Sequence, residues 1–502
     1  MEAVYGASSG FSIWKKHIVK YQALNTHHYY YNIMTTTINK WFALTIVLTA
    51  PLLYVIDIFI INITIPTIQQ NLNATDSEMQ LVISSYLLGS ASFLIIGGRA
   101  GDYLGRKSVF YWGMFLFTIT SAICGLCQTA SQLIISRFFQ GVSSAFMVTQ
   151  SIVFIQVLFV DTKERAKAIG WYGITLSIAA IIGQILGGFL AETQYLINGW
   201  RLIFFINIPV GFISLWAIKK YLVETYKTMN INFDYLGAVL LTIALGGIIY
   251  GITEGREQEW PIWSIVLIIT SIALFFTFLS HQKNRLKIKK DPFIDLNLFR
   301  QKEFNLGLLT VLFHFMLHTA YLLMIAVYLQ KGLGLSALQC GMYFVPHALL
   351  FMLSSILSSK LLVRYGTLVL QFGLLVILIS LVLQLVFFGT QNNTLLSISL
   401  IGLYGFGNGM VLPFLLNIVL NSVSTDDAGT ASGIFSTIQQ TASALGISII
   451  GGVFYSSLET NSAPFEYMES LHSGLFAGIS CLILASIMIY FLPNSLRHPK
   501  LS

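Results

Sequence analysis

Fourteen long apolar stretches constrain the fold of this chain more than any other feature. A helix needs about 20 mostly apolar residues to cross the hydrocarbon core of a bilayer. Stretches of that kind lie at 41–68, 80–100, 108–128, 132–159, 168–192, 201–222, 235–253, 261–281, 305–330, 340–358, 367–388, 394–422, 429–455 and 471–492. Barrel strands span only about 10 residues and alternate in polarity. We therefore expect an all-α polytopic membrane protein with fourteen transmembrane helices.

Composition excludes the main soluble classes. Only 10% of the 502 residues are charged, whereas about 25% is usual in a soluble protein. Four cysteines in the whole chain are too few for a disulfide scaffold. No GxxxxGK[ST] sequence occurs, so a phosphate-binding loop and ATP-driven transport are not expected.

Basic residues alternate between the two sides of the predicted helices. If the N-terminus is cytoplasmic, 24 of the 28 Lys and Arg residues lie on cytoplasmic segments, and only Arg201, Arg256 and Lys331 lie outside. Arg137 falls within a predicted span. This asymmetry predicts that both termini are cytoplasmic. The expected location is a plasma membrane, the bacterial inner membrane. The asymmetry also explains the net charge of +7 as orientation charge, so no nucleic-acid partner is expected.

The spans divide the chain into five parts. These are a cytoplasmic extension (1–40), a six-helix bundle (41–222), two inserted helices with a basic loop (223–304), a second six-helix bundle (305–492) and a cytoplasmic tail (493–502). Residues 1–33 are polar and aromatic and have no apolar run long enough for a signal peptide. A chain that starts at Met34 is therefore expected to insert and function like the full chain, and loss of membrane insertion would contradict this.

Few ionisable residues lie within the predicted spans, and each is costly in hydrocarbon. Asp57 and Arg137 have estimated depths that allow them to meet. Either they form a fixed salt bridge, or Asp57 is a protonatable carboxylate whose charge Arg137 helps to set. His314 and His318 share one helix face. They fit a polar cavity, a proton-handling pair, interhelical bonding or an HxxxH metalloenzyme; without a second histidine box, no metal site is expected.

Five motifs carry a family resemblance. They are YVIDIFIINITIPTI at 54–68, GGRAGDYLGRK at 97–107, RFFQGVSSA at 137–145, WRLIFFINIPVG at 200–211 and AGTASGIFSTIQQTASALG at 428–446. In this order they resemble the major facilitator superfamily, in its 14-helix drug:proton antiporter branch (EmrB/QacA type). The resemblance implies two six-helix bundles plus two inserted helices. It also implies an alternating-access transporter rather than an enzyme, with a proton gradient as energy source and no cofactor.

The resemblance also implies roles for particular residues. Asp57 and Arg137 would serve proton coupling, and the substrate cavity would be lined by Asn62, His314, His318, Asn408 and Asn417. The loop that contains Gly98, Asp102, Gly105, Arg106 and Lys107 would be a conformational latch. There Asp102 is expected to cap a helix or to pair with an arginine. RAGDYLG at 99–105 and KLLVRYG at 360–366 stand 261 residues apart, which predicts that the two bundles are repeats.

One motif departs from the branch. The helix 5 signature GPxxGG appears as GQILGG, with Gly183, Gln184, Gly187 and Gly188. The glycines still permit close helix packing, but the proline kink associated with antiport is missing. Export of drugs or other small amphiphilic molecules is therefore expected, while a metabolite or siderophore exporter or a uniporter stays open. Expected partners are the substrate, the bilayer and, in a Gram-negative host, a periplasmic adaptor and outer-membrane channel.

Overall fold

The protein is seen in a computed structural model that describes residues 39–193, 198–224, 234–288, 290, 292, 294–388, 393–421, 423, 428–458 and 462–492. Met34, the expected N-terminal extension apart from its last residues, and the expected tail lie outside these ranges. Every regular element in the described residues is helical. The fourteen predicted spans are all occupied by helices, in the predicted order.

The helices of the first half are α2 (Lys40–Leu72), α3 (Asp76–Leu104), α4 (Arg106–Leu126), α5 (Ala130–Leu158), α6 (Thr162–Ala191), α7 (Gly199–Phe205) and α8 (Asn207–Tyr221). The inserted pair is α9 (Tyr235–Glu257) and α10 (Ile262–Lys287). A 3₁₀ turn, η1 (Leu298–Arg300), leads into the second half: α11 (Lys302–Val327) with its π-helical end η2 (Tyr328–Gly332), α12 (Ala337–Tyr365), α13 (Leu368–Phe387), α14 (Thr394–Asn421), α15 (Ala428–Tyr455) and α16 (Pro464–Tyr490). Within the described residues, thirteen helical segments are long and apolar enough to span a membrane, with α7 and α8 counted as one. Helix α15, the thirteenth of the fourteen segments in chain order, is not among them.

The two halves repeat the same packing. In the first half α3 packs on α5, α2 on α6, and α4 on α5 and α8. In the second half α12 packs on α14, α11 on α15, and α13 on α14 and α16. The turn between the second and third helix of each half contains a glycine with positive φ, namely Gly105 (97°) and Gly366 (55°). These glycines end the two motifs that predicted the repeat, so the prediction is confirmed.

The halves are tied together at one end of the bundle, which we call the Asn73 end because α2 ends there. Gln330 Nε2 donates to the Ile63 carbonyl at 2.9 Å. Lys331 Nζ donates to Gln69 Oε1 at 2.6 Å. Each of these hydrogen bonds joins α2 to η2 and therefore crosses from one half to the other.

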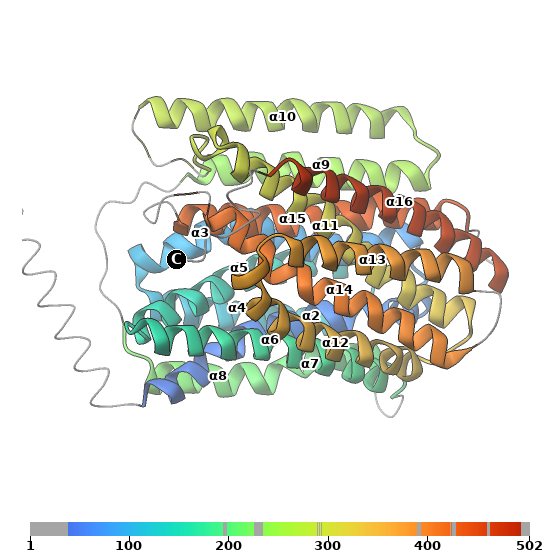
Figure 1. Cartoon of the computed structure of the whole chain (residues 1–502), viewed down its shortest axis with the longest axis horizontal. Coiled ribbons are helices and arrows are strands. Elements are labelled where there is room, and N and C mark those ends of the chain that lie inside the picture. The colour runs from blue at the N-terminus through green and yellow to red at the C-terminus, as the bar shows by residue number, and fades with distance from the viewer. Residues whose placement is uncertain are drawn as a thin grey trace, which may run out of the picture.

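The inserted pair lies along one side of the bundle (Figure 1). Helix α10 packs mainly on α9, while α9 contacts α3 of the first half and α15 of the second. At the Asn73 end, Ser77 Oγ of α3 donates to Glu254 at 2.9 Å. Thr253 Oγ1 donates to Ser448 Oγ of α15, also at 2.9 Å. Helix α9 thus bridges the two halves.

At the opposite end of the inserted pair, Asp234 caps α9 and joins it to α10. Its side chain is buried, with 5% exposed. Its carboxylate accepts hydrogen bonds from the Gly237 amide (2.9 Å), His281 (2.8 Å) and Gln282 (2.8 Å). Burial raises the pKa of Asp234, but the hydrogen bonds from His281 and Gln282 outweigh it, so the pKa lies below its ordinary value of 3.8.

Asp234→Asn is expected to lower the unfolding free energy by about 1 to 3 kcal/mol at neutral pH, because hydrogen bonds to a charged acceptor are lost. A carboxylate with a depressed folded-state pKa contributes stability above its unfolded pKa and loses it as pH falls through the folded value. The part of the difference that comes from the Asp234 charge should therefore persist at neutral pH and shrink only below about pH 4. Thermal unfolding in detergent across this range measures it, and a difference that disappears already at pH 6 would contradict the assignment.

Candidate functional site

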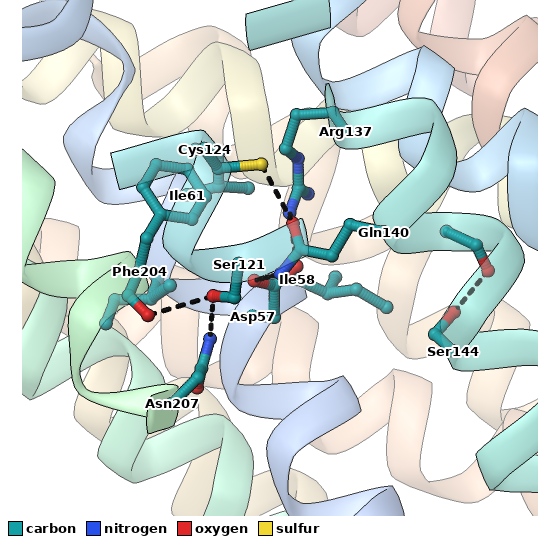
Figure 2. A network of polar contacts seen from close by, with 12 residues as sticks. Asp57, Ile58, Ile61, Ser121, Cys124, Arg137, Gln140, Ser144, Phe204 and Asn207 are labelled. Atoms are coloured by element: carbon teal, nitrogen blue, oxygen red, sulfur yellow. Dashed lines mark hydrogen bonds and ion pairs between the residues drawn. The ribbon is translucent and has the colours of Figure 1, made fainter. Parts of the chain in front are cut away.

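Asp57 and Arg137 meet in the interior of the first half. Asp57 lies on α2 and Arg137 on α5, and each side chain is 1% exposed. Arg137 Nη1 forms an ion pair with Asp57 Oδ2. Gln140, one turn further along α5, donates from Nε2 to Asp57 Oδ1 at 2.9 Å (Figure 2). Both carboxylate oxygens are therefore engaged.

Arg137 is held on several sides. Its Nη1 also donates to Gln140 Oε1 at 2.8 Å, and its Nε donates to the Val82 carbonyl at 3.4 Å. The guanidinium carbon lies 4.1 Å from the centre of the Tyr86 ring, which is a cation–π distance. A buried charge is tolerated only when it is paired and hydrogen-bonded, and these contacts meet that requirement.

A second set of contacts fixes the helices around the pair. Asn207 Nδ2 donates to Ser121 Oγ at 2.9 Å, and Ser121 Oγ donates to the Phe204 carbonyl at 2.8 Å (Figure 2). Phe204 is the last residue but one of α7, and Asn207 is the first residue of α8, with Ile206 between the two helices. The WRLIFFINIPVG motif therefore contributes a polar joint that binds α4 to the break between α7 and α8.

The residues predicted to line a cavity do not all come together. His314 and His318 of α11 and Asn408 of α14 are buried in the second half. Asn62 is buried in the first half, where its Nδ2 donates to the Ile58 carbonyl of its own helix at 2.9 Å. The Asn417 side chain lies outside the described residues. In the part of the chain that is described, no group of three or more His, Cys, Asp or Glu side chains is placed to hold a metal ion.

Two contributors to the site were not singled out from the sequence. Gln140 stands inside RFFQGVSSA, and its i+3 spacing from Arg137 places both on one face of α5. That spacing was a usable signal. Tyr86 had none, because a tyrosine in an apolar helix looks the same whether it faces an arginine or lipid.

The loop between α3 and α4, which is the expected latch, is bound by an acidic residue that the sequence did not indicate. Glu224, just beyond α8, accepts hydrogen bonds from the Lys107 amide (3.0 Å), the Ser108 amide (3.1 Å) and Ser108 Oγ (2.6 Å). Gly105 precedes α4 and has no side chain to cap it, so Glu224 caps α4 from a distance. Lys107 Nζ donates to the Lys219 carbonyl at 3.0 Å. The Asp102 side chain lies outside the described residues, and its expected capping role stays a prediction.

Glu224→Ala is expected to lower the unfolding free energy by about 1 to 2 kcal/mol, the usual cost of losing a helix N-cap. Glu224→Gln should lose less, because its amide oxygen still accepts a hydrogen bond. Melting temperatures of both variants in detergent measure the difference. Equal losses in the two would show that the charge, and not the hydrogen bonds, is what stabilises the loop.

The GQILGG motif, which lies on α6, packs closely against neighbouring helices. A Cβ on Gly183 or Gly187 would stand 2.9 Å from the carbonyl oxygens of Ile56 and Ile60 on α2. A Cβ on Gly188 would stand 2.5 Å from the Ala337 carbonyl of α12 in the other half. The predicted role of these glycines in close packing is confirmed.

Gln184 stands where the branch has proline. Helix α6 runs unbroken through this position. The Gln184 side chain is 2% exposed, and its Oε1 has no hydrogen-bond partner among the described residues. The chain therefore has an unbroken helix and a buried polar atom where the branch has proline.

The chain matches known proteins along most of its length. The family model described as Major Facilitator Superfamily matches residues 47–232 and 229–447. The probable actinorhodin transporter of Streptomyces coelicolor is 31% identical over 423 residues, which cover 84% of this chain and 73% of that protein. The multidrug resistance protein Stp of Mycobacterium tuberculosis is 29% identical over 432 residues, which cover 85% of this chain and 78% of that protein.

Solved structures share the fold. An inward-facing, unoccupied bacterial homolog of the human lysosomal transporter Spinster superposes with a TM-score of 0.64 at 15% identity, covering 92% of this chain and 99% of that one. The inward-open xylose transporter XylE of E. coli gives a TM-score of 0.62 at 15% identity, covering 91% and 97%. The match to the family model over most of the chain shows that it belongs to the major facilitator superfamily, as its motifs predicted. It is a multi-pass membrane transporter and not an enzyme.

Proposed function

We propose that this transporter exports drugs or other small amphiphilic molecules in exchange for protons. The buried Asp57–Arg137–Gln140 cluster is the observation that carries the proposal. A carboxylate in the membrane interior is a default candidate for proton handling. The names of two relatives, an actinorhodin transporter and a multidrug resistance protein, support the export of small organic compounds.

The geometry supports a way to couple protonation to movement. The Asp57 carboxylate, on α2, accepts hydrogen bonds from Arg137 and Gln140, both on α5. A proton that binds Asp57 therefore competes with these two interactions. Protonation removes the charge that attracts Arg137 and weakens the contact between α2 and α5. In alternating access, that change biases the equilibrium between two arrangements of the bundles.

The proposed orientation follows from the basic loops. With Lys40, the start of α2, on the cytoplasmic side, the Asn73 end faces outward and both termini are cytoplasmic in a bacterial inner membrane. The hydrogen bonds between Gln330 and Ile63 and between Lys331 and Gln69 then close the outer side. A periplasmic adaptor and outer-membrane channel would be further partners in a Gram-negative host. The proton gradient would be the energy source, and transport would need no cofactor.

Gln184 favours a second candidate, an exporter of metabolites or siderophores or a uniporter that does not use protons. Helix α6 carries Gln184 and lacks the proline that the branch associates with antiport. Efflux of a substrate panel from a pump-deficient host, with and without a protonophore, separates the candidates. Efflux that stops with the protonophore supports exchange for protons; efflux that continues down a gradient supports the uniporter.

A further inference from the structure

A hydrogen bond joins the two halves close to the Asp57–Arg137 pair. Tyr54 lies on α2 one turn before Asp57, so the two side chains share a face of that helix. Its hydroxyl accepts a hydrogen bond from Gln440 Nε2 on α15 of the second half. Both residues stand near the middle of their helices. This contact between the halves is therefore separate from the hydrogen bonds at the Asn73 end.

The same face of α15 makes a second contact with the first half. Thr437 lies one turn before Gln440, and its Oγ1 donates to the Ala91 carbonyl of α3 at 3.4 Å. Thr437 and Gln440 are both buried. Both belong to the AGTASGIFSTIQQTASALG motif at 428–446. This motif therefore supplies hydrogen bonds by which the second half holds α2 and α3.

Tyr54 is linked to Arg137 through Tyr86 of α3. The rings of Tyr54 and Tyr86 are stacked, with their centres 6.0 Å apart and an angle of 29° between their planes. The Arg137 guanidinium lies over the Tyr86 ring. A Cβ on Gly141 would stand 2.0 Å from the Tyr86 carbonyl, so α5 and α3 are in close contact at this level. A shift of Arg137 or of α5 therefore displaces Tyr86 and, through the stacked rings, Tyr54.

Helix α2 provides a second and shorter link. Asp57 attaches α2 to α5 of its own half, and Tyr54 attaches the same part of α2 to α15 of the other half. Among the described residues, the titratable side chains that interact electrostatically with Asp57 are Arg137, Tyr86, Tyr54 and Cys124 of α4. Arg137 carries the only permanent charge in this set. The loss of the Asp57 charge therefore acts first on Arg137 and on the attachment of α2 to α5.

The contacts from Asp57 to Gln440 form one continuous path between the halves. Coupling between two sites is carried by packed side chains and hydrogen bonds that have two discrete arrangements. The Asp57 end of this path depends on the charge of a carboxylate, and the Gln440 end crosses between two halves that rock against each other. We propose that Tyr54 and Gln440 are positioning residues that transmit the charge state of Asp57 to the contact between the halves.

The charge state of Asp57 then decides how firmly the halves are held together. A charged Asp57 fixes Arg137, keeps Tyr54 in place for Gln440 and favours the arrangement that is closed at the Asn73 end. A neutral Asp57 weakens this hold. In an exchanger, a transporter that has released its proton and carries no substrate must not change arrangement, because that step would uncouple the two movements. This role rests on the proposed function, whereas the link between Asp57 and Gln440 is measured without transport.

The test measures amide hydrogen exchange of the purified full chain in lipid nanodiscs at one pH. Asp57→Asn stands for the neutral carboxyl group, and Gln440→Leu removes the hydrogen bond to Tyr54. Each change is expected to raise the exchange rate of residues 63–72 and 328–333, at the Asn73 end, about fivefold, the effect of one hydrogen bond. Because both changes act through one path, the double variant should also stay near about fivefold, whereas independent effects would multiply to about 25-fold.

Gln439→Leu is the matched control, because Gln439 is the adjacent glutamine and points about 100° away from Gln440 around α15. The effect of Asp57→Asn should be unchanged in that background. Tyr54→Phe keeps the ring stack and removes the hydroxyl group, so it should reproduce the result of Gln440→Leu. Exchange in α13, which packs on α12, α14 and α16 of its own half, is the reference for a general loss of stability.

Two results would overturn the proposal: effects that multiply in the double variant, or an Asp57→Asn protein whose Asn73 end exchanges like that of the wild type. If Asp57→Asn alone does not fold, Asp57→Asn with Arg137→Ala removes both charges and takes its place in the comparison. Failure of protonophore-sensitive efflux in cells would instead overturn the proposed function and leave the measured link between Asp57 and Gln440 standing.

Discussion

Asp57→Asn is expected to abolish proton-coupled export. The asparagine keeps the shape of the carboxylate and cannot change its charge, so the competition between a proton and Arg137 no longer exists. From the sequence alone the variant is expected to stay folded and to lose active efflux. The structure adds a further expectation, because Asn leaves the Arg137 charge buried without its ion-pair partner. A lower melting temperature should therefore accompany the loss of transport.

Efflux of a fluorescent substrate from energised cells measures this, at equal abundance of variant and wild type in the membrane. Glu164→Gln is the matched control, because it also neutralises a carboxylate that pairs with a basic residue. The Lys40–Glu164 pair is 29% and 38% exposed, and such pairs contribute about 0 to 1 kcal/mol. Normal, protonophore-sensitive efflux by Asp57→Asn would mean that the coupling proton binds elsewhere.

Arg137→Ala is expected to be the most destabilising single change in the first half. It leaves the Asp57 carboxylate in the interior without its counter-charge, and breaking a buried pair in this way costs about 3 to 5 kcal/mol. It also removes the guanidinium group that packs against Tyr86. The double variant, Asp57→Asn with Arg137→Ala, removes both charges and should recover much of the stability while remaining unable to couple transport to protons.

A double-mutant cycle on thermal stability isolates the interaction between the two charges. We expect the double variant to be more stable than the sum of the two single effects predicts. If the two effects simply add, the charges do not stabilise one another, and Arg137 is better explained as a helix-packing or substrate residue. Gln140→Ala serves as the companion measurement, because it removes one hydrogen bond to Asp57 and leaves both charges in place.

The sequence predicted the helices well because their apolar lengths and the basic loops are properties of consecutive residues. The main errors lie at helix ends. Helix α3 begins at Asp76, not at residue 80, because Thr75 and Glu78 form a capping box that extends the helix into polar sequence. Hydropathy does not detect such a polar first turn.

The sequence identified residues of the site only where they are ionisable. Asp57 and Arg137 stand out because ionisable residues are rare in a membrane span, and the structure places them in contact. Glu224 looked like any acidic residue in a cytoplasmic loop, and its capping of α4 depends on a contact between segments 116 residues apart.

The bridge formed by α9 changes how many bodies must move during transport. Two adjacent residues of α9 form the bridge. Glu254 accepts a hydrogen bond from Ser77 of the first half, and Thr253 donates one to Ser448 of the second. Any motion that separates α3 from α15 at the Asn73 end must break one of these hydrogen bonds, at about 1 kcal/mol each. In such a motion the inserted pair must part from one of its two neighbours. The strengths of its two attachments decide which half it accompanies.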